Sequence, residues 1–149
     1  MTTTIPSRLA KRPTFKGLVV PYMVDAKKRP IDFKAVDKAH VDRCAQERAC
    51  GVCGERVRPG KDRYVFLGPL RDLQCFGDPW MHEDCGEYTA LACPFVSGKH
   101  RRWHAGPEPI LQPFLDAWMM VVSRQGRVQW HMKSWHFQPV DIKTQATFE

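Results

Sequence analysis

The 149-residue sequence contains no long run of hydrophobic residues. The apolar stretch Leu18 to Val20, near the N-terminus, is far shorter than a membrane span or the core of a signal peptide requires. We therefore expect a cytoplasmic protein that has no membrane partner. In that compartment thiols stay reduced, so the six cysteines favour metal binding over a framework of disulfide bonds.

Internal repeats and low-complexity segments are also absent from the sequence. Hydrophobic residues make up 43% of the chain and charged residues 26%, which is typical of a folded globular protein and not of a disordered one. The length suits one hydrophobic core. We therefore predict a single domain that spans residues 1–149.

Acidic residues are scarce in the two flanks of the chain. The net charge is +7, and residues 1–49 contain eleven basic and five acidic residues. The middle, residues 50–95, has five basic and seven acidic residues, whereas residues 96–149 have seven and four. If the protein binds a polyanion, the flanks are therefore expected to make the contact.

The first two-thirds of the chain divide into an arm and a helical segment. Four prolines among basic residues predict that residues 1–33 form an extended arm over the core. Residues 34–96 follow, and apolar side chains spaced three to four apart predict a first helix that ends near Arg48, with Asp32 as its N-cap. Glycine-rich turns and β-prone residues then predict a hairpin within residues 55–75.

A second helix is predicted from about Met81 to Ala92, before Pro94. Residues 97–149 are expected to form a basic loop and then an antiparallel β meander. Its first strand would start at Ala117, although the preceding apolar residues also have helical spacing. Gly126 would supply the turn to an alternating strand.

Two ligand pairs carry the chemistry of this sequence. Cys50-Gly-Val-Cys53 and His82-Glu-Asp-Cys85 form the pattern C-x2-C-x28-H-x2-C, and such ligands suit tetrahedral Zn2+. His82 and Cys85 lie about one helical turn apart, so both can reach one ion. Four protein ligands leave no open coordination position, which predicts a structural zinc and no small-molecule substrate.

Other interpretations of the cysteines and histidine remain open. The four candidate ligands could be buried thiols and a core histidine, or four of the six cysteines could hold an iron–sulfur cluster. Cys44 and Cys93 are interpreted as small buried residues. Cys75, in a predicted loop, is the spare ligand.

A knuckle, a hairpin and a helix whose first turn gives the last two ligands resemble the treble-clef zinc finger over residues 49–93. The resemblance implies an α+β fold with a treble-clef core, here with an upstream helix and a C-terminal antiparallel meander. Treble clefs occur in nucleases, ribosomal proteins, transcription factors and protein-interaction domains, so the resemblance does not select a function. The segments RCAQERACGVCG and PWMHEDCGEYTALACP also resemble short proteins of actinobacteria and their phages, a likeness that implies no activity.

Enzyme motifs are not complete in this sequence. An HNH-like nuclease resembles this layout but needs a histidine base on the hairpin, and residues 55–75 contain none; asparagine is absent from the whole chain. His100 and His104 have the spacing of a zinc-protease pair, but Arg101 stands where a glutamate would act as base. The deaminase pattern is also missing. We therefore expect no enzyme, with an HNH-like nuclease kept as an alternative.

The resulting hypothesis is a non-enzymatic, zinc-stabilised module that contacts DNA, RNA or a nucleic-acid-processing machine. The alternative is a phage or host regulator that binds a host protein. Basic residues of both flanks are the candidate nucleic-acid contacts: Lys27, Lys28, Arg29, Lys99, Arg101 and Arg102, with Arg8, Lys11, Arg12 and Lys16 in the arm. Trp103 could stack on a base. Four aromatic residues of the meander are either a binding surface or half-buried strand residues: Trp130, Trp135, His131 and His136.

Overall fold

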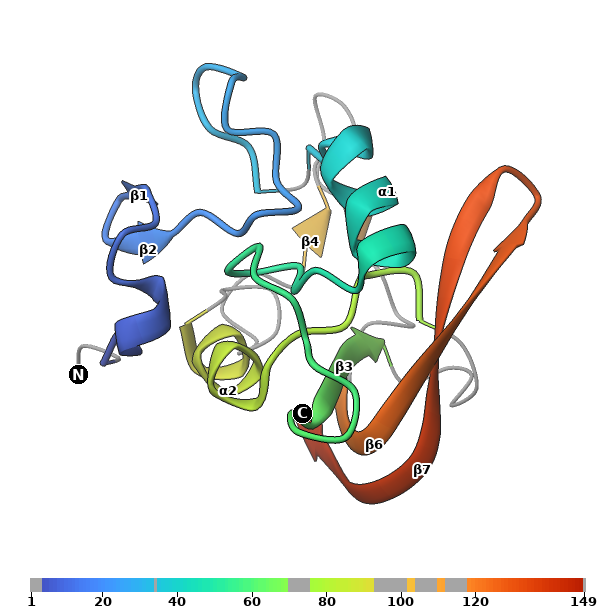
Figure 1. The fold of residues 1–149 in the computed structure, drawn as a ribbon. Helices are drawn as coiled ribbons and strands as arrows, with labels where there is room; N and C mark the ends of the chain where they lie inside the picture. Colours follow the sequence, from blue (N-terminus) through green and yellow to red (C-terminus); the bar gives the residue numbers. More distant parts are fainter. Residues whose placement is uncertain are drawn as a thin grey trace.

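The computed structural model describes residues 4–33, 35–69, 76–92, 102–103, 110–111 and 118–148. Helices and antiparallel strands are mixed, as predicted (Figure 1). The elements in chain order are η1 (Ser7–Leu9), β1 (Thr14–Phe15), β2 (Leu18–Val19), α1 (Lys38–Glu47), β3 (Tyr64–Pro69), α2 (Glu83–Ala92), β4 (Arg102–Trp103), β5 (Ile110–Leu111), β6 (Trp118–His131) and β7 (Ser134–Phe148). None of the helices described has the length and apolar character needed to cross a membrane.

The C-terminal strands differ in their boundaries from the predicted meander. β3, β6 and β7 form one antiparallel sheet in the order β3-β6-β7. The expected turn at Gly126 is wrong, because β6 runs through this residue and the chain reverses at Met132 and Lys133. Both of these residues have a positive φ, as a two-residue hairpin turn of type I′ requires.

Gly126 is needed in the middle of β6 because an aromatic ring lies against it. A Cβ atom at this position would stand 2.6 Å from Trp80 Cε3 and 3.0 Å from Tyr64 Cδ2. Both rings are fully buried and cannot move aside easily. The glycine therefore serves close packing and not chain reversal.

Replacing Gly126 with alanine is expected to lower the free energy of unfolding by about 1–3 kcal/mol, because the added methyl group overpacks the core. Gly77→Ala is the matched control: a Cβ there has no atom within 4 Å, so a change within about 0.5 kcal/mol is expected. Urea denaturation of the two metal-loaded variants measures both values. Equal stability of the variants would contradict the close approach of Trp80.

Helix α1 begins later than the sequence predicts. The N-cap is Asp37 and not Asp32, and its carboxylate accepts a hydrogen bond from the His40 N–H at 3.2 Å. Just before the helix, Val36 forms an antiparallel β-bridge with Val24. Because of this pairing, Val36, which its apolar spacing places in the predicted helix, lies outside α1. The end of the helix at Arg48, in the left-handed conformation, agrees with the prediction.

The N-terminal residues lie against the rest of the molecule. Leu9 of η1 is 1% exposed and belongs to the core. The backbone N–H groups of Tyr22 and Met23 donate hydrogen bonds at 2.9 Å to carbonyls of the Cys50–Cys53 turn. This segment therefore supports the turn that carries two of the predicted metal ligands.

The last part of the hairpin predicted within residues 55–75, residues 70–75, lies outside the residues described. β3 pairs with the distant strand β6. A single antiparallel bridge joins Val65 of β3 to Met81, with two backbone hydrogen bonds of 2.9 Å. This bridge places the start of α2 beside the sheet.

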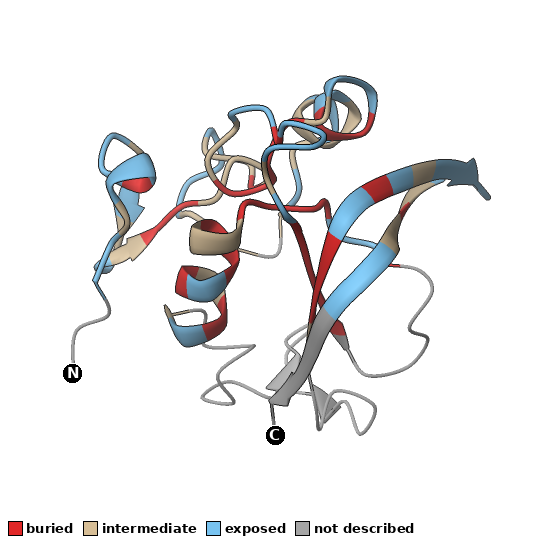
Figure 2. Ribbon diagram, turned by 60° about the horizontal axis from the view of Figure 1, so that its bottom comes forward, coloured by how far each residue is buried: buried red, intermediate tan, exposed pale blue. Residues whose placement is uncertain are grey.

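An aromatic cluster forms the centre of the core. Trp80 is fully buried, and its ring meets those of Tyr64, Phe66 and Phe137 edge-on, with centroids 4.9–6.3 Å apart. The next residues in the chain, Met81 and His82, are also buried. The core therefore continues directly into the segment that holds the predicted histidine ligand (Figure 2).

Candidate metal centre

The Cys50–Cys53 turn curls around the Cys50 sulfur. Backbone N–H groups of Val52 and Cys53 donate to Cys50 Sγ at 3.4 and 3.5 Å, and the N–H of Glu55 donates to Cys53 Sγ at 3.4 Å. The Cys50 N–H donates to the Glu55 carbonyl at 2.7 Å, which closes the turn. These N–H donors stabilise negative charge on sulfur and point both thiols toward the same side.

The second pair of candidate ligands lies at the N-terminal end of α2. The His82 carbonyl accepts the Gly86 N–H at 2.8 Å, which places His82 just before the helix and Cys85 in its first turn. The His82 N–H donates to Cys50 Sγ at 3.4 Å and so ties the two pairs together. Free N–H groups and the positive end of the helix dipole favour a thiolate at Cys85.

The structure brings the four predicted ligands together. One ligand atom from each of Cys50, Cys53, His82 and Cys85 lies within 4.8 Å of the others. Cys50, His82 and Cys85 are buried, and Cys53 is half-buried. Such a group of soft and borderline donors is compatible with a metal ion.

The three thiols compete for negative charge. Burial opposes ionisation of Cys50, but hydrogen bonds from Cys53 and Cys85 and from backbone N–H groups outweigh it and lower the pKa of Cys50 well below its usual value. The pKa of Cys85 is raised, because its thiol is hydrogen-bonded to Cys50 and Cys53, is buried, and faces their charge. A divalent cation among the sulfurs would remove this competition and allow all three to ionise.

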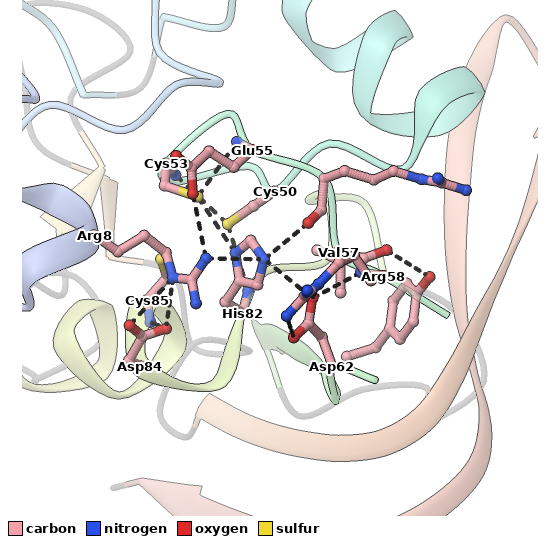
Figure 3. A network of polar contacts seen from close by, with 12 residues as sticks. Arg8, Cys50, Cys53, Glu55, Val57, Arg58, Asp62, His82, Asp84 and Cys85 are labelled. Atoms are coloured by element: carbon pink, nitrogen blue, oxygen red, sulfur yellow. Dashed lines mark hydrogen bonds and ion pairs between the residues drawn. The ribbon is translucent and has the colours of Figure 1, made fainter. Parts of the chain in front are cut away.

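The hydrogen bonds of His82 orient its ring toward the cysteines (Figure 3). Nε2 lies 3.0 Å from the Arg56 carbonyl oxygen, which can only accept, and this contact is shorter than the 3.4 Å to the donor Arg8 Nη1, so the proton is assigned to this nitrogen. Asp62 Oδ2, 3.7 Å from Nε2, favours the same tautomer. Nδ1 is therefore left with its lone pair, 3.3 Å from Cys53 Sγ. This is the arrangement of a metal-binding histidine with an outer hydrogen-bond partner.

Charged residues surround the four ligands, and the sequence did not predict them in this role. Arg8 of η1 pairs with Asp84 at 3.2 Å and Glu55 at 3.3 Å, and its Nη1 lies 3.4 Å from His82 Nε2 (Figure 3). Asp62 has its pKa lowered to about 2, first of all by hydrogen bonds from the side chain of Arg58. In the sequence, the only local sign of the Arg58–Asp62 ion pair is that the two residues are four positions apart.

The remaining cysteines divide between the core and the undescribed residues. Cys44 on α1 is fully buried and is not one of the four grouped residues. Burial, and then the nearby Cys50 charge, raise the pKa of Cys44 to about 12, so it stays a neutral thiol. This agrees with its interpretation as a small core residue. Cys75 and Cys93 lie outside the described residues.

The predicted nucleic-acid contacts are only partly visible. Lys27, Lys28 and Arg29 are exposed in the loop before α1. Lys99 and Arg101 lie outside the residues described, and Arg102 is placed in β4 by its backbone. Arg8, also considered as a contact, is instead engaged at the ligand group.

Comparison with models of protein families, with curated protein sequences and with solved structures finds no significant match. Four convergent ligands can hold an ion that links the Cys50–Cys53 turn to α2.

Proposed function

We propose that the protein is a non-enzymatic binding module held together by a structural Zn2+ ion, and that it contacts nucleic acid. The observation that carries the first part is the convergence of three cysteines and one histidine, all supplied by the chain itself. Zinc is the ion that such a four-coordinate sulfur and nitrogen set favours.

The proposed centre is of the treble-clef type. Its knuckle is the turn closed by the bridge between Ala49 and Arg56, and its helix is α2. The bridge between Val65 and Met81 stands where a treble clef has its hairpin. The order knuckle, paired strands and helix supports this assignment.

The proposed absence of catalysis follows from the ligand set. With four protein ligands, the ion would have no position for an activated water. The only histidine at the centre, His82, is used on both ring nitrogens, one toward the cysteines and one toward Arg56. Among the residues described, no other histidine is near enough to the ligand group to join it.

Nucleic acid is the proposed partner because three consecutive basic residues, 27–29, are exposed between two acidic ones, Asp25 and Asp32. In the loop before α1, Lys27 and Lys28 are exposed, and Arg29 is held over the loop by hydrogen bonds from its Nη1 to the Ala26 and Lys28 carbonyls. Lys28 also pairs with Asp32 at a distance of 3.7 Å, an ion pair that an incoming phosphate could replace. The loop thus offers three cations at one place.

Neutralising this loop tests the proposal. Changing Lys27, Lys28 and Arg29 together to glutamine is expected to weaken binding to a random-sequence DNA duplex about tenfold at low salt, because fewer phosphates are neutralised and fewer counterions are released. The slope of log affinity against log salt should become shallower by about 0.9 for each phosphate that the variant no longer neutralises. Fluorescence anisotropy at about 50 and 200 mM salt measures both quantities.

A matched control separates the loop from the overall charge. Lys38→Gln, Lys61→Gln and Arg63→Gln also remove three exposed positive charges, but from α1 and the loop before β3. A smaller decrease in affinity is expected for the control. Equal decreases would assign binding to net charge alone, and no binding by the wild-type protein at low salt would refute the proposed function.

A further inference from the structure

The end of the β6–β7 hairpin forms a two-stranded ribbon beyond the sheet. β3 pairs with β6 only as far as Ser123, whereas the β6–β7 pairing continues to His131 and Ser134. Residues 125–140, called here the distal ribbon, therefore have no third named strand beside them in the described structure, and a single bridge of two 2.8 Å backbone hydrogen bonds joins Phe137 of the ribbon to Phe76. The distal ribbon runs beside α1 and ends in the turn at Met132 and Lys133 (Figure 1).

One face of the distal ribbon is attached to the body of the protein. Because side chains alternate along a strand, Gly126, Val128 and Phe137 share this inner face, where they are buried or half-buried. Trp135, on the same face, donates its indole N–H to Asp42 of α1 at 2.8 Å. This hydrogen bond fixes the ribbon against α1, so its other face is presented in a defined orientation.

The outer face carries side chains that hydrogen-bond and lacks carboxylates. By the strand register, its members are Gln125, Arg127, Gln129 and His131 on β6 and Ser134, His136, Gln138 and Val140 on β7. The four β6 residues and Ser134 are exposed, and His136, Gln138 and Val140 are half-buried. Apart from Val140, at the end far from the turn, this face is polar and carries donors and acceptors, which is the composition of a recognition surface and not of an apolar docking face.

We propose that this outer face enters the major groove of double-stranded DNA and reads base edges. The proposal rests on the proposed function and names its duplex ligand and its reading element. The major groove admits a two-stranded ribbon, and glutamine and arginine are the side chains that pair bidentately with adenine and guanine there.

Arg127 is the best-placed reading residue. Its Nε donates to Gln138 Oε1 of the paired strand at 3.2 Å, which fixes the guanidinium while leaving its two Nη groups free. A side chain held in advance loses less entropy on binding. The two Nη groups could donate together to O6 and N7 of guanine.

The charge of the hairpin complements DNA. Between Trp118 and Phe148 the basic residues are Arg124, Arg127, Lys133 and Lys143, and the one acidic residue is Asp141. Asp141 pairs with Arg124 at 3.4 Å. Lys133 in the turn and Arg127 on the outer face remain available to phosphates and bases.

The shape of the ribbon favours DNA over duplex RNA. The major groove of A-form RNA is deep and narrow, and side chains cannot read it. The same arrangement of hydrogen-bonding residues on a rigid ribbon therefore fits B-form DNA.

The test starts with selection of a binding site from a pool of random DNA duplexes by the full-length, metal-loaded protein. Affinities are then measured for the selected duplex, for the same duplex built with 7-deazapurines, and for the duplex RNA of that sequence. The deaza bases remove the major-groove N7 acceptors but leave the phosphates unchanged. We expect the deaza duplex and the RNA to bind about tenfold more weakly or worse.

The key variant is Arg127→Ala, and Arg124→Ala is its control on the same strand with the same change of charge. Arg127→Ala should weaken binding to the selected duplex about tenfold or more and change the selected sequence, whereas Arg124→Ala should weaken it less than about threefold. Arg127→Lys keeps the charge but loses the planar guanidinium that can donate two parallel hydrogen bonds. This variant should therefore resemble the alanine variant in the sequence that it selects. Circular dichroism and metal content confirm that each variant is folded.

Three results would overturn the ribbon as the reading element while leaving the proposed function intact. These are DNA binding without any selected sequence, equal affinity for the deaza or RNA duplex, and equal decreases in affinity from the two arginine variants. By contrast, absence of all nucleic-acid binding by the wild-type protein would overturn the proposed function itself.

Discussion

Replacing Cys50 with serine is expected to abolish metal binding and to unfold the protein. Cys50 is fully buried, and its sulfur accepts hydrogen bonds from the backbone of its own turn and from His82. Structural zinc contributes roughly 10–16 kcal/mol in small zinc domains. The whole stability of an ordinary domain is only about 5–15 kcal/mol, so without this contribution no folded state remains.

The measurement combines elemental analysis for zinc and iron with far-ultraviolet circular dichroism. The wild type should contain one equivalent of zinc, and a strong chelator should unfold it as the substitution does. Cys44→Ala is the matched control, because Cys44 is also fully buried but lies outside the ligand group. It should retain the metal and the fold. A metal-free Cys50→Ser variant that remains fully folded would refute a structural metal centre.

The ligand group could be predicted from the sequence because its geometry is local. In each pair the two ligands are three residues apart, so a turn around Cys50 or one turn of helix at His82 brings them to the same side. Only the meeting of the two pairs depends on the fold. The neighbours of the site could not be predicted in this way. Arg8 is 74 residues from His82, and the group that accepts the hydrogen bond from His82 Nε2 is a backbone carbonyl, that of Arg56.

The limits of the helices and strands were predicted well only where local chemistry determined them. α2 agrees within two residues with the prediction, and Cys85 lies in its first turn with His82 just before it. The start of α1 was misplaced, since pairing of Val24 with Val36 removes apolar residues from the helix. Gly126 was assigned to a turn because no local pattern reveals that Trp80 lies against it.

Replacing Trp80 with alanine is expected to lower the free energy of unfolding by about 3–5 kcal/mol. The indole is fully buried between Tyr64, Phe66 and Phe137, and the guanidinium of Arg48 lies 5.4 Å from its ring centroid. Its removal leaves a cavity among rigid rings that cannot close, and it also removes the edge-on packing of the rings. Urea denaturation in the presence of excess zinc measures the change.

Trp130→Ala is the control for this variant, because Trp130 is 49% exposed near the hairpin turn. Removing its packing on the Trp135 ring, 4.9 Å away, should cost about 1 kcal/mol at most. The backbone carbonyl of Trp80 accepts the Gly51 N–H at 2.9 Å, a bond that alanine retains, so Trp80→Ala should still bind one equivalent of metal. Equal destabilisation by the two substitutions would contradict the central position of Trp80. A folded Trp80→Ala variant that lacks metal would contradict a ligand group that is held in place by the backbone of the Cys50–Cys53 turn.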